Sequence, residues 1–294
     1  MIKPKVCILR SAGTNCDKET AAAFKLAGAE PEFLHINSLV SRQRMLSGFH
    51  ILALPGGFSY GDDIASGKIF ANELRFKLAD SLRQFIADGK LIIGICNGFQ
   101  ILVKSGLLPG TRPDGTLPNR IGKCALPGQS GRCAPLHSTW PDRIGRCAPL
   151  RDTSLIINDS GKFEARWVYL KPAGKSVWTR GLKKIIYLPV AHGEGKFITE
   201  DKSVLSRLKK NNQVVFQYCD AKGKFTGYPD NPNGSMENIA GVCDETGRVF
   251  GLMPHPERYI FAAQHPRNWD KLNAIFGDGL QIFRNGVDFI NKSF

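Results

Sequence analysis

Short apolar runs alternate with helix-like stretches through the first hundred residues. The apolar runs predict strands at 6–9, 32–36, 50–54 and 91–95. Between them, apolar positions recur with helical spacing over 16–27 and 73–87, which predicts two helices. Strands that alternate with helices of this length are typical of an α/β fold with a doubly wound, mostly parallel sheet flanked by helices.

The second half of the chain is richer in strand patterns. Short candidate strands occur at 155–157, 167–170, 185–190, 214–218 and 249–253. Helical patterns return only near the end, at 269–276 and 278–290. We therefore predict a single domain that spans residues 1–294, in which an α/β first half continues into a more β-rich second half.

One segment, at about 111–152, does not fit this alternation. It is rich in proline and contains a near-repeat, because residues 120–125 recur in similar form at 143–148. A long segment without periodicity is uncommon inside a compact domain, so we predict a surface insertion, largely disordered and without a part in the chemistry. Its three cysteines and His137 lack the spacing of a zinc site, and we expect no metal.

Charge and cysteine usage change this picture only a little. The chain carries 40 Lys and Arg against 26 Asp and Glu, a net charge of +14, but no clustered run marks a nucleic-acid face. We interpret the excess as a basic surface and expect no nucleic acid as partner. The eight cysteines contain no CxxC pair, which favours free thiols. No apolar stretch reaches the roughly 18 residues of a membrane helix, and no signal-like apolar region is present, so we expect a cytoplasmic protein that binds no membrane.

The strongest chemical signal is the segment Gly94-Ile95-Cys96-Asn97-Gly98, which joins the apolar strand at 91–95 to a helical pattern. A strand, a sharp turn with a nucleophile between two glycines, and a helix form a nucleophile elbow. The glycines leave room for the strained turn. A cysteine at a helix N-terminus is favoured as the thiolate, so Cys96 is predicted to be an activated nucleophile.

A cysteine nucleophile needs a base and a group that orients the base. The turn Pro254-His255-Pro256-Glu257 offers both, directly after the apolar strand at 249–253. Glu257 is close enough in sequence to bond the imidazole of His255 and to fix its tautomer. We therefore predict that Cys96, His255 and Glu257 form a catalytic triad.

Acyl transfer also needs donors for the oxyanion. The turn at Cys96 can supply the backbone N–H of Asn97. Gly56 and Gly57 follow the strand at 50–54, and glycine lets the backbone approach a reacting group closely. Sites in parallel sheets form at the carboxyl ends of strands, so we expect this loop to meet Cys96.

These residues together resemble the class I glutamine amidotransferases, and more narrowly the glutaminase subunits of phosphoribosylformylglycinamidine synthases. The wider match rests on Gly94–Gln100 and on Pro254-His255-Pro256-Glu257. The narrower match rests on further segments in the same order, at 13–17, 55–63, 158–164, 191–195, 228–235 and 238–241. The resemblance implies a flavodoxin-like α/β fold.

The resemblance also implies a reaction. Cys96 would attack the side-chain amide of glutamine, and His255, oriented by Glu257, would protonate the departing ammonia. Gln100, Asn158, Asp159 and Ser160 would position glutamine. The ammonia would pass to a separate synthetase subunit that uses ATP and Mg, with a small third subunit bridging the two. The glutaminase subunit itself would bind no cofactor.

Two departures from the family pattern and two other functions remain open at this point. The insertion interrupts a region that the family crosses quickly, and residues 155–157 are apolar where a polar pair with a histidine is expected. The same triad could serve a free-standing cysteine hydrolase, a peptidase or a γ-glutamyl hydrolase, because one fold hosts many chemistries. The basic charge could instead mark a nucleic-acid-binding protein.

Overall fold

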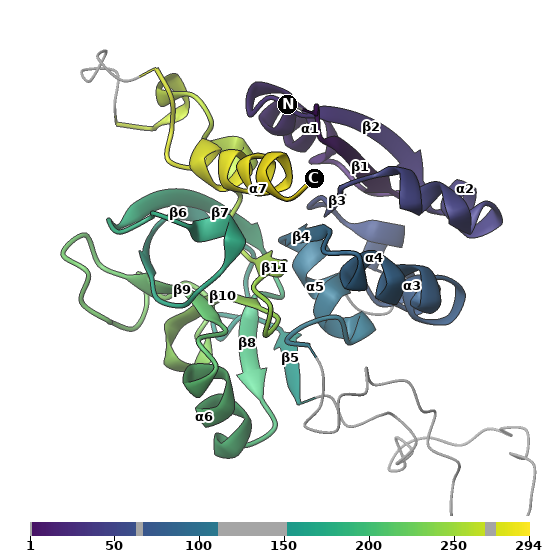
Figure 1. Ribbon diagram of the computed structural model, residues 1–294. Helices are drawn as coiled ribbons and strands as arrows, with labels where there is room; N and C mark the ends of the chain where they lie inside the picture. The colour runs from purple at the N-terminus through teal and green to yellow at the C-terminus, as the bar shows by residue number, and fades with distance from the viewer. Residues whose placement is uncertain (1, 63–66, 111–151, 268–274) are drawn as a thin grey trace, which may run out of the picture.

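The computed structural model describes residues 2–62, 67–110, 152–267 and 275–294 (Figure 1). The predicted insertion at 111–152 lies outside the described residues, except for its last position. The predicted helix at 269–276 lies outside them except for residues 275 and 276, which are not helical. Both remain predictions.

The centre of the fold is a nine-stranded sheet with the order β2-β1-β3-β4-β11-β10-β9-β6-β7. Its first five strands pair in parallel. They are β2 (Glu30–His35), β1 (Lys5–Arg10), β3 (Ile51–Leu54), β4 (Leu91–Ile95) and β11 (Val249–Leu252). This is the 2-1-3-4-5 order of flavodoxin-like sheets, and the predicted fold class is confirmed.

Beyond β11 the sheet continues with antiparallel pairs. The added strands are β10 (Ile239–Cys243), β9 (Val214–Cys219), β6 (Glu164–Pro172) and β7 (Ile186–His192). A separate two-stranded sheet joins β5 (Thr153–Ile156) to β8 (Lys196–Thr199). The sequence pattern did not predict β8 and β10, because each is short and β10 contains Ala and Gly in place of strong strand formers.

Helices pack around the two sheets. They are α1 (Asp17–Leu26), α2 (Ile36–Ser41), α3 (Lys68–Lys77), α4 (Ala79–Ala87), α5 (Asn97–Ser105), α6 (Lys202–Lys210) and α7 (Leu280–Ser293). One of them, α6, lies beside β8 and not beside the parallel strands. Short 3₁₀ segments lie at Gln43–Gly48, Ser59–Asp62, Val177–Thr179, Met236–Asn238, Pro256–Arg258 and Ala262–Gln264. Figure 1 shows α7 beside α1, and α3, α4 and α5 grouped elsewhere around the sheet.

Three differences from the sequence prediction have a local structural cause. The predicted helix at 73–87 is two helices, because Leu78 has a non-helical backbone with φ −124° and ψ 7°. The predicted strand at 32–36 ends at His35, where the imidazole caps α2 by accepting from the N–H of Asn37. Helix α6 was not predicted; Asp201 caps it by accepting from the N–H groups of Ser203 and Val204.

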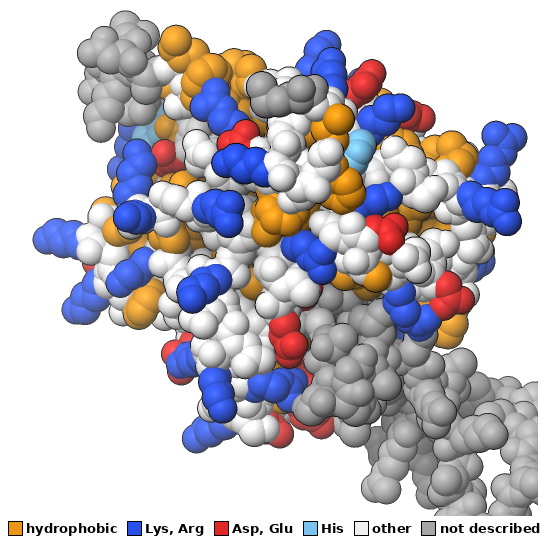
Figure 2. Space-filling view, in the orientation of Figure 1, with side chains coloured by type: hydrophobic (Ala, Val, Ile, Leu, Met, Phe, Trp, Pro, Cys, Tyr) orange, Lys and Arg blue, Asp and Glu red, His pale blue; other side chains and the backbone are white. Residues whose placement is uncertain are grey.

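The core is continuous from the parallel strands into α5. Every residue of β3, β4 and β11 is buried, as expected for strands covered on both faces. Every residue of α5 is buried as well, so this helix lies inside the molecule. Figure 2 shows Lys and Arg side chains spread over the visible face without gathering in one stripe. Among the described residues, none of the helices combines the length and hydrophobicity that crossing a membrane requires.

The elbow between β4 and α5 depends on close backbone contact with β3. A Cβ atom on Gly98 would lie 1.9 Å from the carbonyl oxygen of Leu54. We therefore expect Gly98→Ala to lower the free energy of unfolding by about 1–3 kcal/mol, the usual cost of overpacking, in a chemical denaturation experiment. Gly48→Ala is the control, since nothing lies within 4 Å of its Cβ position. Equal stability of the two variants would contradict this packing.

Candidate active site

Cys96 occupies the strained position at the tip of the elbow. Its backbone has φ 51° and ψ −107°, an unfavourable region for a residue with a side chain. Its N–H donates to the carbonyl of Leu252 at 2.8 Å, which continues the pairing of β4 with β11. The side chain precedes α5 and is 5% exposed. The elbow therefore has the geometry that presents a nucleophile at the end of a sheet.

His255 and Glu257 form a buried pair at the end of β11. Nδ1 of His255 lies 2.7 Å from Oε1 of Glu257, and the two residues are 2% and 0% exposed. The N–H of His255 donates to the carbonyl of Pro189 on β7 at 2.8 Å, which anchors the turn to the far edge of the sheet. The predicted pairing of His255 with Glu257 is thus present in the structure.

Electrostatics in this pair favour a protonated imidazole. Burial disfavours the charged form, but the Glu257 carboxylate, followed by Cys96, raises the pKa of His255 well above its ordinary value. An imidazolium beside a thiol can stabilise a thiolate and can later donate a proton to a leaving group. Cys96, His255 and Glu257 therefore form one interacting unit.

The Gly56-Gly57 loop lies against the same residues. A Cβ atom on Gly56 would be 2.8 Å from Cε1 of His255 and 3.4 Å from Cβ of Cys96, so only glycine fits. The carbonyl of Gly56 accepts from the N–H groups of Asn15 and Cys16, at 3.3 and 3.2 Å. This loop therefore brings backbone next to the nucleophile, where the sequence predicts oxyanion donors.

Asn97 and Gln100 connect the elbow to its surroundings. The side-chain oxygen of Asn97 accepts from the backbone N–H and the hydroxyl of Ser59, and its amide nitrogen donates to Oε1 of Gln100 at 2.9 Å. Nε2 of Gln100 donates to the carbonyl of Glu194 at 2.5 Å. Both side chains are buried and bonded to protein groups. The role of Gln100 in positioning glutamine therefore remains a prediction. To bind glutamine directly, the side chain of Gln100 would have to give up its hydrogen bonds to Asn97 and to the carbonyl of Glu194.

Asn158, Asp159 and Ser160 lie in one turn but in different environments. Asn158 is buried; its side-chain oxygen accepts from the N–H of Gly195 at 3.0 Å, and its amide nitrogen donates to the carbonyls of His192 and Lys162. The other two residues are exposed: Asp159 pairs with Lys196, and Ser160 accepts from the N–H of Lys162. Asn158 therefore fixes the 192–195 segment near Cys96.

His192 is a site residue to which the sequence analysis assigned no role. It is 3% exposed, and Nδ1 lies 3.2 Å from the side-chain oxygen of Asn158. Burial, with His255 as a smaller cause, lowers the pKa of His192 to about 3, so the ring is neutral. The carbonyl of the preceding residue, Ala191, lies 3.6 Å from Sγ of Cys96. The sequence signal was its place in the family-like segment 191–195, which by itself assigned His192 no role.

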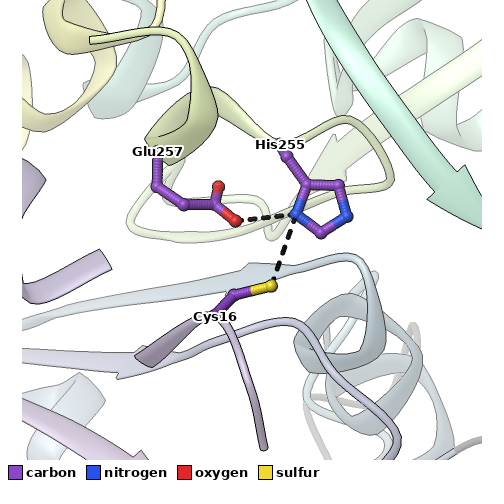
Figure 3. A group of neighbouring side chains, drawn as sticks. All are labelled: Cys16, His255 and Glu257. Carbon is purple, nitrogen blue, oxygen red and sulfur yellow. Dashed lines mark hydrogen bonds and ion pairs between the residues drawn. The ribbon is translucent and has the colours of Figure 1, made fainter. Parts of the chain in front are cut away.

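Cys16 and Arg258 also border the site without having been predicted there. Figure 3 shows Cys16 on the side of the His255 ring that carries Nδ1, with Sγ 3.9 Å from that nitrogen. Arg258 follows Glu257 in the chain, and its Nη2 donates to Sγ of Cys16 at 3.1 Å. No sequence signal pairs them, because 242 positions separate the two residues.

Comparison with known proteins agrees with this geometry. The family model of the CobB/CobQ-like glutamine amidotransferase domain matches residues 3–122 and 144–290. The chain is 44% identical to a phosphoribosylformylglycinamidine synthase subunit PurQ from Dehalococcoides mccartyi, over 99% of this chain and 100% of that protein. It is 40% identical to the subunit of the same name from Methanococcus maripaludis, over 99% and 100%.

A solved structure supports the same relationship. The chain resembles one from the structure of PurLQS from Thermotoga maritima, with a TM-score of 0.66 and 29% identity. The similarity covers 98% of this chain and 100% of the other. The whole chain, with its described strands and helices, is therefore comparable with these proteins.

The close approach of Gly56 to the side chains of Cys96 and His255 can be tested directly. In Gly56→Ala, the added methyl would displace the imidazole from Cys96, and we expect alkylation of Cys96 by iodoacetamide at neutral pH to slow roughly tenfold, because the thiol loses the group that activates it. Peptide mass spectrometry would measure the rate for Cys96 alone. Gly227→Ala is the control, because nothing lies within 4 Å of its Cβ position. An unchanged rate in Gly56→Ala would show that the loop does not constrain the pair.

Proposed function

The chain belongs to the CobB/CobQ-like glutamine amidotransferase family and groups there with the PurQ subunits of phosphoribosylformylglycinamidine synthase, and we propose that it hydrolyses glutamine to supply ammonia to that enzyme. The observation that carries the proposal is the strained Cys96 elbow beside the buried His255–Glu257 pair. The near-full-length similarity to PurQ subunits identifies glutamine as the substrate.

The proposed reaction proceeds in two steps. The Cys96 thiolate attacks the side-chain amide carbon of glutamine, and His255 donates a proton to the departing nitrogen, which leaves as ammonia. The remaining γ-glutamyl thioester is then attacked by water, which restores the thiol and releases glutamate. Glu257 stabilises the protonated imidazole throughout.

The other site residues support this reaction in different ways. We assign the oxyanion to backbone N–H groups near Gly57 and Asn97, because the loop and the elbow flank the thiol. Gln100 and Asn158 hold the segment at 192–195 through their amides, and so would shape the glutamine pocket. Asp159 and Ser160, at the surface turn, would act through the position of that turn.

The partner in this proposal is a synthetase subunit. The relatives from Dehalococcoides mccartyi and Methanococcus maripaludis are named as subunits of a synthase, and the synthesis step needs ATP and Mg, which we assign to the large subunit. A small bridging subunit completes the proposed complex, and we propose no cofactor in the glutaminase subunit. Five described cysteines are free thiols, which supports a cytoplasmic location.

An exposed aromatic pair marks a surface suited to this partner. Phe58 and Phe163 are 46% and 52% exposed, and their rings stack with centroids 6.3 Å apart. Phe58 follows Gly57, and the ring of Phe163 lies 3.9 Å from the Cβ position of Gly193. Exposed aromatic rings are enriched in protein interfaces. We infer that the synthetase subunit docks over this pair, where it would also keep released ammonia from water.

Loss of the nucleophile tests the reaction. We expect Cys96→Ala to reduce glutamine hydrolysis by the assembled complex at least roughly 10⁴-fold, since no other group can form the thioester. Synthesis with added ammonium in place of glutamine should persist. Cys243→Ala is the control, because that thiol lies on β10 and bonds the carbonyl of Lys175. Retained ammonia release in Cys96→Ala, or strong peptide turnover by the isolated subunit, would favour a free-standing hydrolase.

Loss of the aromatic pair tests the partner surface. We expect the double variant Phe58→Ser/Phe163→Ser to raise the Kd for the synthetase subunit roughly tenfold or more, as measured by calorimetry, because buried aromatic rings dominate such interfaces. Phe76→Ser provides the matched control, since Phe76 is 59% exposed on α3. Equal affinities of the two variants for the synthetase subunit would show that the docking surface does not include Phe58 and Phe163.

A further inference from the structure

A second thiol lies directly behind the catalytic histidine. Cys16 is 1% exposed, and its Sγ lies 3.9 Å from Nδ1 of His255, the nitrogen that also bonds Oε1 of Glu257 at 2.7 Å (Figure 3). The proposed reaction uses Cys96 and gives Cys16 no task. The position of Cys16 beside His255 and Glu257, the pair that donates the proton to the leaving nitrogen, therefore requires a separate explanation.

The bonds of Cys16 are those of a neutral thiol. Its S–H donates to the side-chain oxygen of Asn15 at 3.1 Å, and its sulfur accepts from Nη2 of Arg258 at 3.1 Å. Burial raises the pKa of Cys16, so the thiol keeps the proton that it donates. Cys16 thus connects a polar loop to a cation without carrying a charge itself.

The arrangement of Arg258 is unusual for a guanidinium. Within the described ranges, no carboxylate lies at ion-pair distance from it, and the partner that it contacts is the thiol of Cys16. Its neighbour in the chain, Glu257, is fully buried, and among the described residues Oε2 of this carboxylate has no hydrogen-bond partner. Guanidinium and carboxylate groups pair strongly wherever geometry allows, so something keeps these two apart.

Contact between Arg258 and Glu257 would damage the proposed chemistry. The guanidinium would neutralise the carboxylate that supports the imidazolium of His255, and its own charge would repel that imidazolium. His255 would then lose its proton at lower pH, although the leaving nitrogen of glutamine needs that proton.

We propose that Cys16 is a positioning residue of this site: its thiol holds the guanidinium of Arg258 away from Glu257, and this leaves Glu257 to support the protonated imidazole of His255. The inference rests on the glutaminase reaction proposed above. It gives Arg258 a fixed position close to the site without an ionic bond to the catalytic carboxylate.

A metal ion is a poorer explanation of the same cluster. Donor atoms of Cys16, His255 and Glu257 all lie within 4.8 Å of one another. A cation bound there would have to break the 2.7 Å contact between His255 and Glu257. It would also face the guanidinium of Arg258, 3.1 Å from the sulfur that would be its ligand.

The charged and titratable groups around His255 determine which deprotonation is seen in the pH dependence of glutamine hydrolysis. Cys96 approaches from the elbow, Cys16 from the loop before α1, and His192 from β7. His192 is neutral over the working range, because burial lowers its pKa to about 3. Burial opposes the charge of Arg258, but Cys16, then Glu257 without an ion pair, and then Glu19 on α1 raise its pKa. The loss of activity at alkaline pH therefore reports deprotonation of His255.

The test is the pH dependence of glutamine hydrolysis by the assembled complex. Cys16→Ala frees the guanidinium, and we expect the alkaline limb of kcat to move about one unit to lower pH, with a lower kcat and an unchanged KM. Cys16→Ser should behave like the unmodified protein, because a hydroxyl offers the same donor and acceptor. Cys16→Ala/Arg258→Ala should restore the limb, since the freed cation is gone.

Three outcomes would overturn the proposal: an unshifted limb in Cys16→Ala, a shift that persists in the double variant, or a shift of the same size in Cys16→Ser. If Cys16→Ala does not fold, as judged by its unfolding temperature, the single variant Arg258→Ala tests the proposal. The alkaline limb of its pH profile for kcat must then lie at the same pH as that of the unmodified protein or at a higher pH, and a limb at lower pH would overturn the proposal. An unmodified complex that does not hydrolyse glutamine contradicts the proposed function itself, and this inference then fails with it.

Discussion

The contact between Nδ1 of His255 and Oε1 of Glu257 is the interaction on which the site depends. Glu257 is completely buried, and a buried carboxylate is costly unless a positive group compensates it. His255 supplies that charge only while it is protonated, so the carboxylate and the imidazolium stabilise each other. The fold must therefore keep water and competing cations away from this pair, and the neighbouring loops can be understood as meeting that requirement.

Loops from distant parts of the chain converge on this pair. Parallel strands end at one edge of the sheet, which brings the turns after β3, β4 and β11 together. The N–H of His255 then bonds Pro189, and the carbonyl of Gly56 binds the loop that carries Cys16. The strained backbone of Cys96 is held in the middle of these contacts. Strain at one residue is tolerated because several backbone hydrogen bonds around it are satisfied.

Much of the site could be predicted because its chemistry is local in the sequence. Cys96 lies between two glycines after an apolar strand, and Glu257 is two positions from His255, so both spacings carry geometric meaning. Cys16 and His192 could not be assigned a place in the site in this way, since the contacts of Cys16 with His255 and Arg258 span more than 200 positions and that of His192 with Asn158 spans 34. The fold shows the same limit: parallel β–α alternation was readable, whereas the break at Leu78 depends on packing that a periodic pattern does not encode.

The residues expected to hold the substrate show where such reasoning needs structure. Gln100 and Asn158 are polar and lie close to the nucleophile, yet their amides bond the backbone of the 192–195 segment. A substrate pocket with walls of backbone can be stiff and can still present donors and acceptors. In that arrangement the polar side chains form hydrogen bonds within the protein, and backbone groups are left to bind the ligand. The same division applies to Cys16, whose polar thiol is proposed to hold a cation in place while the chemistry proceeds at Cys96.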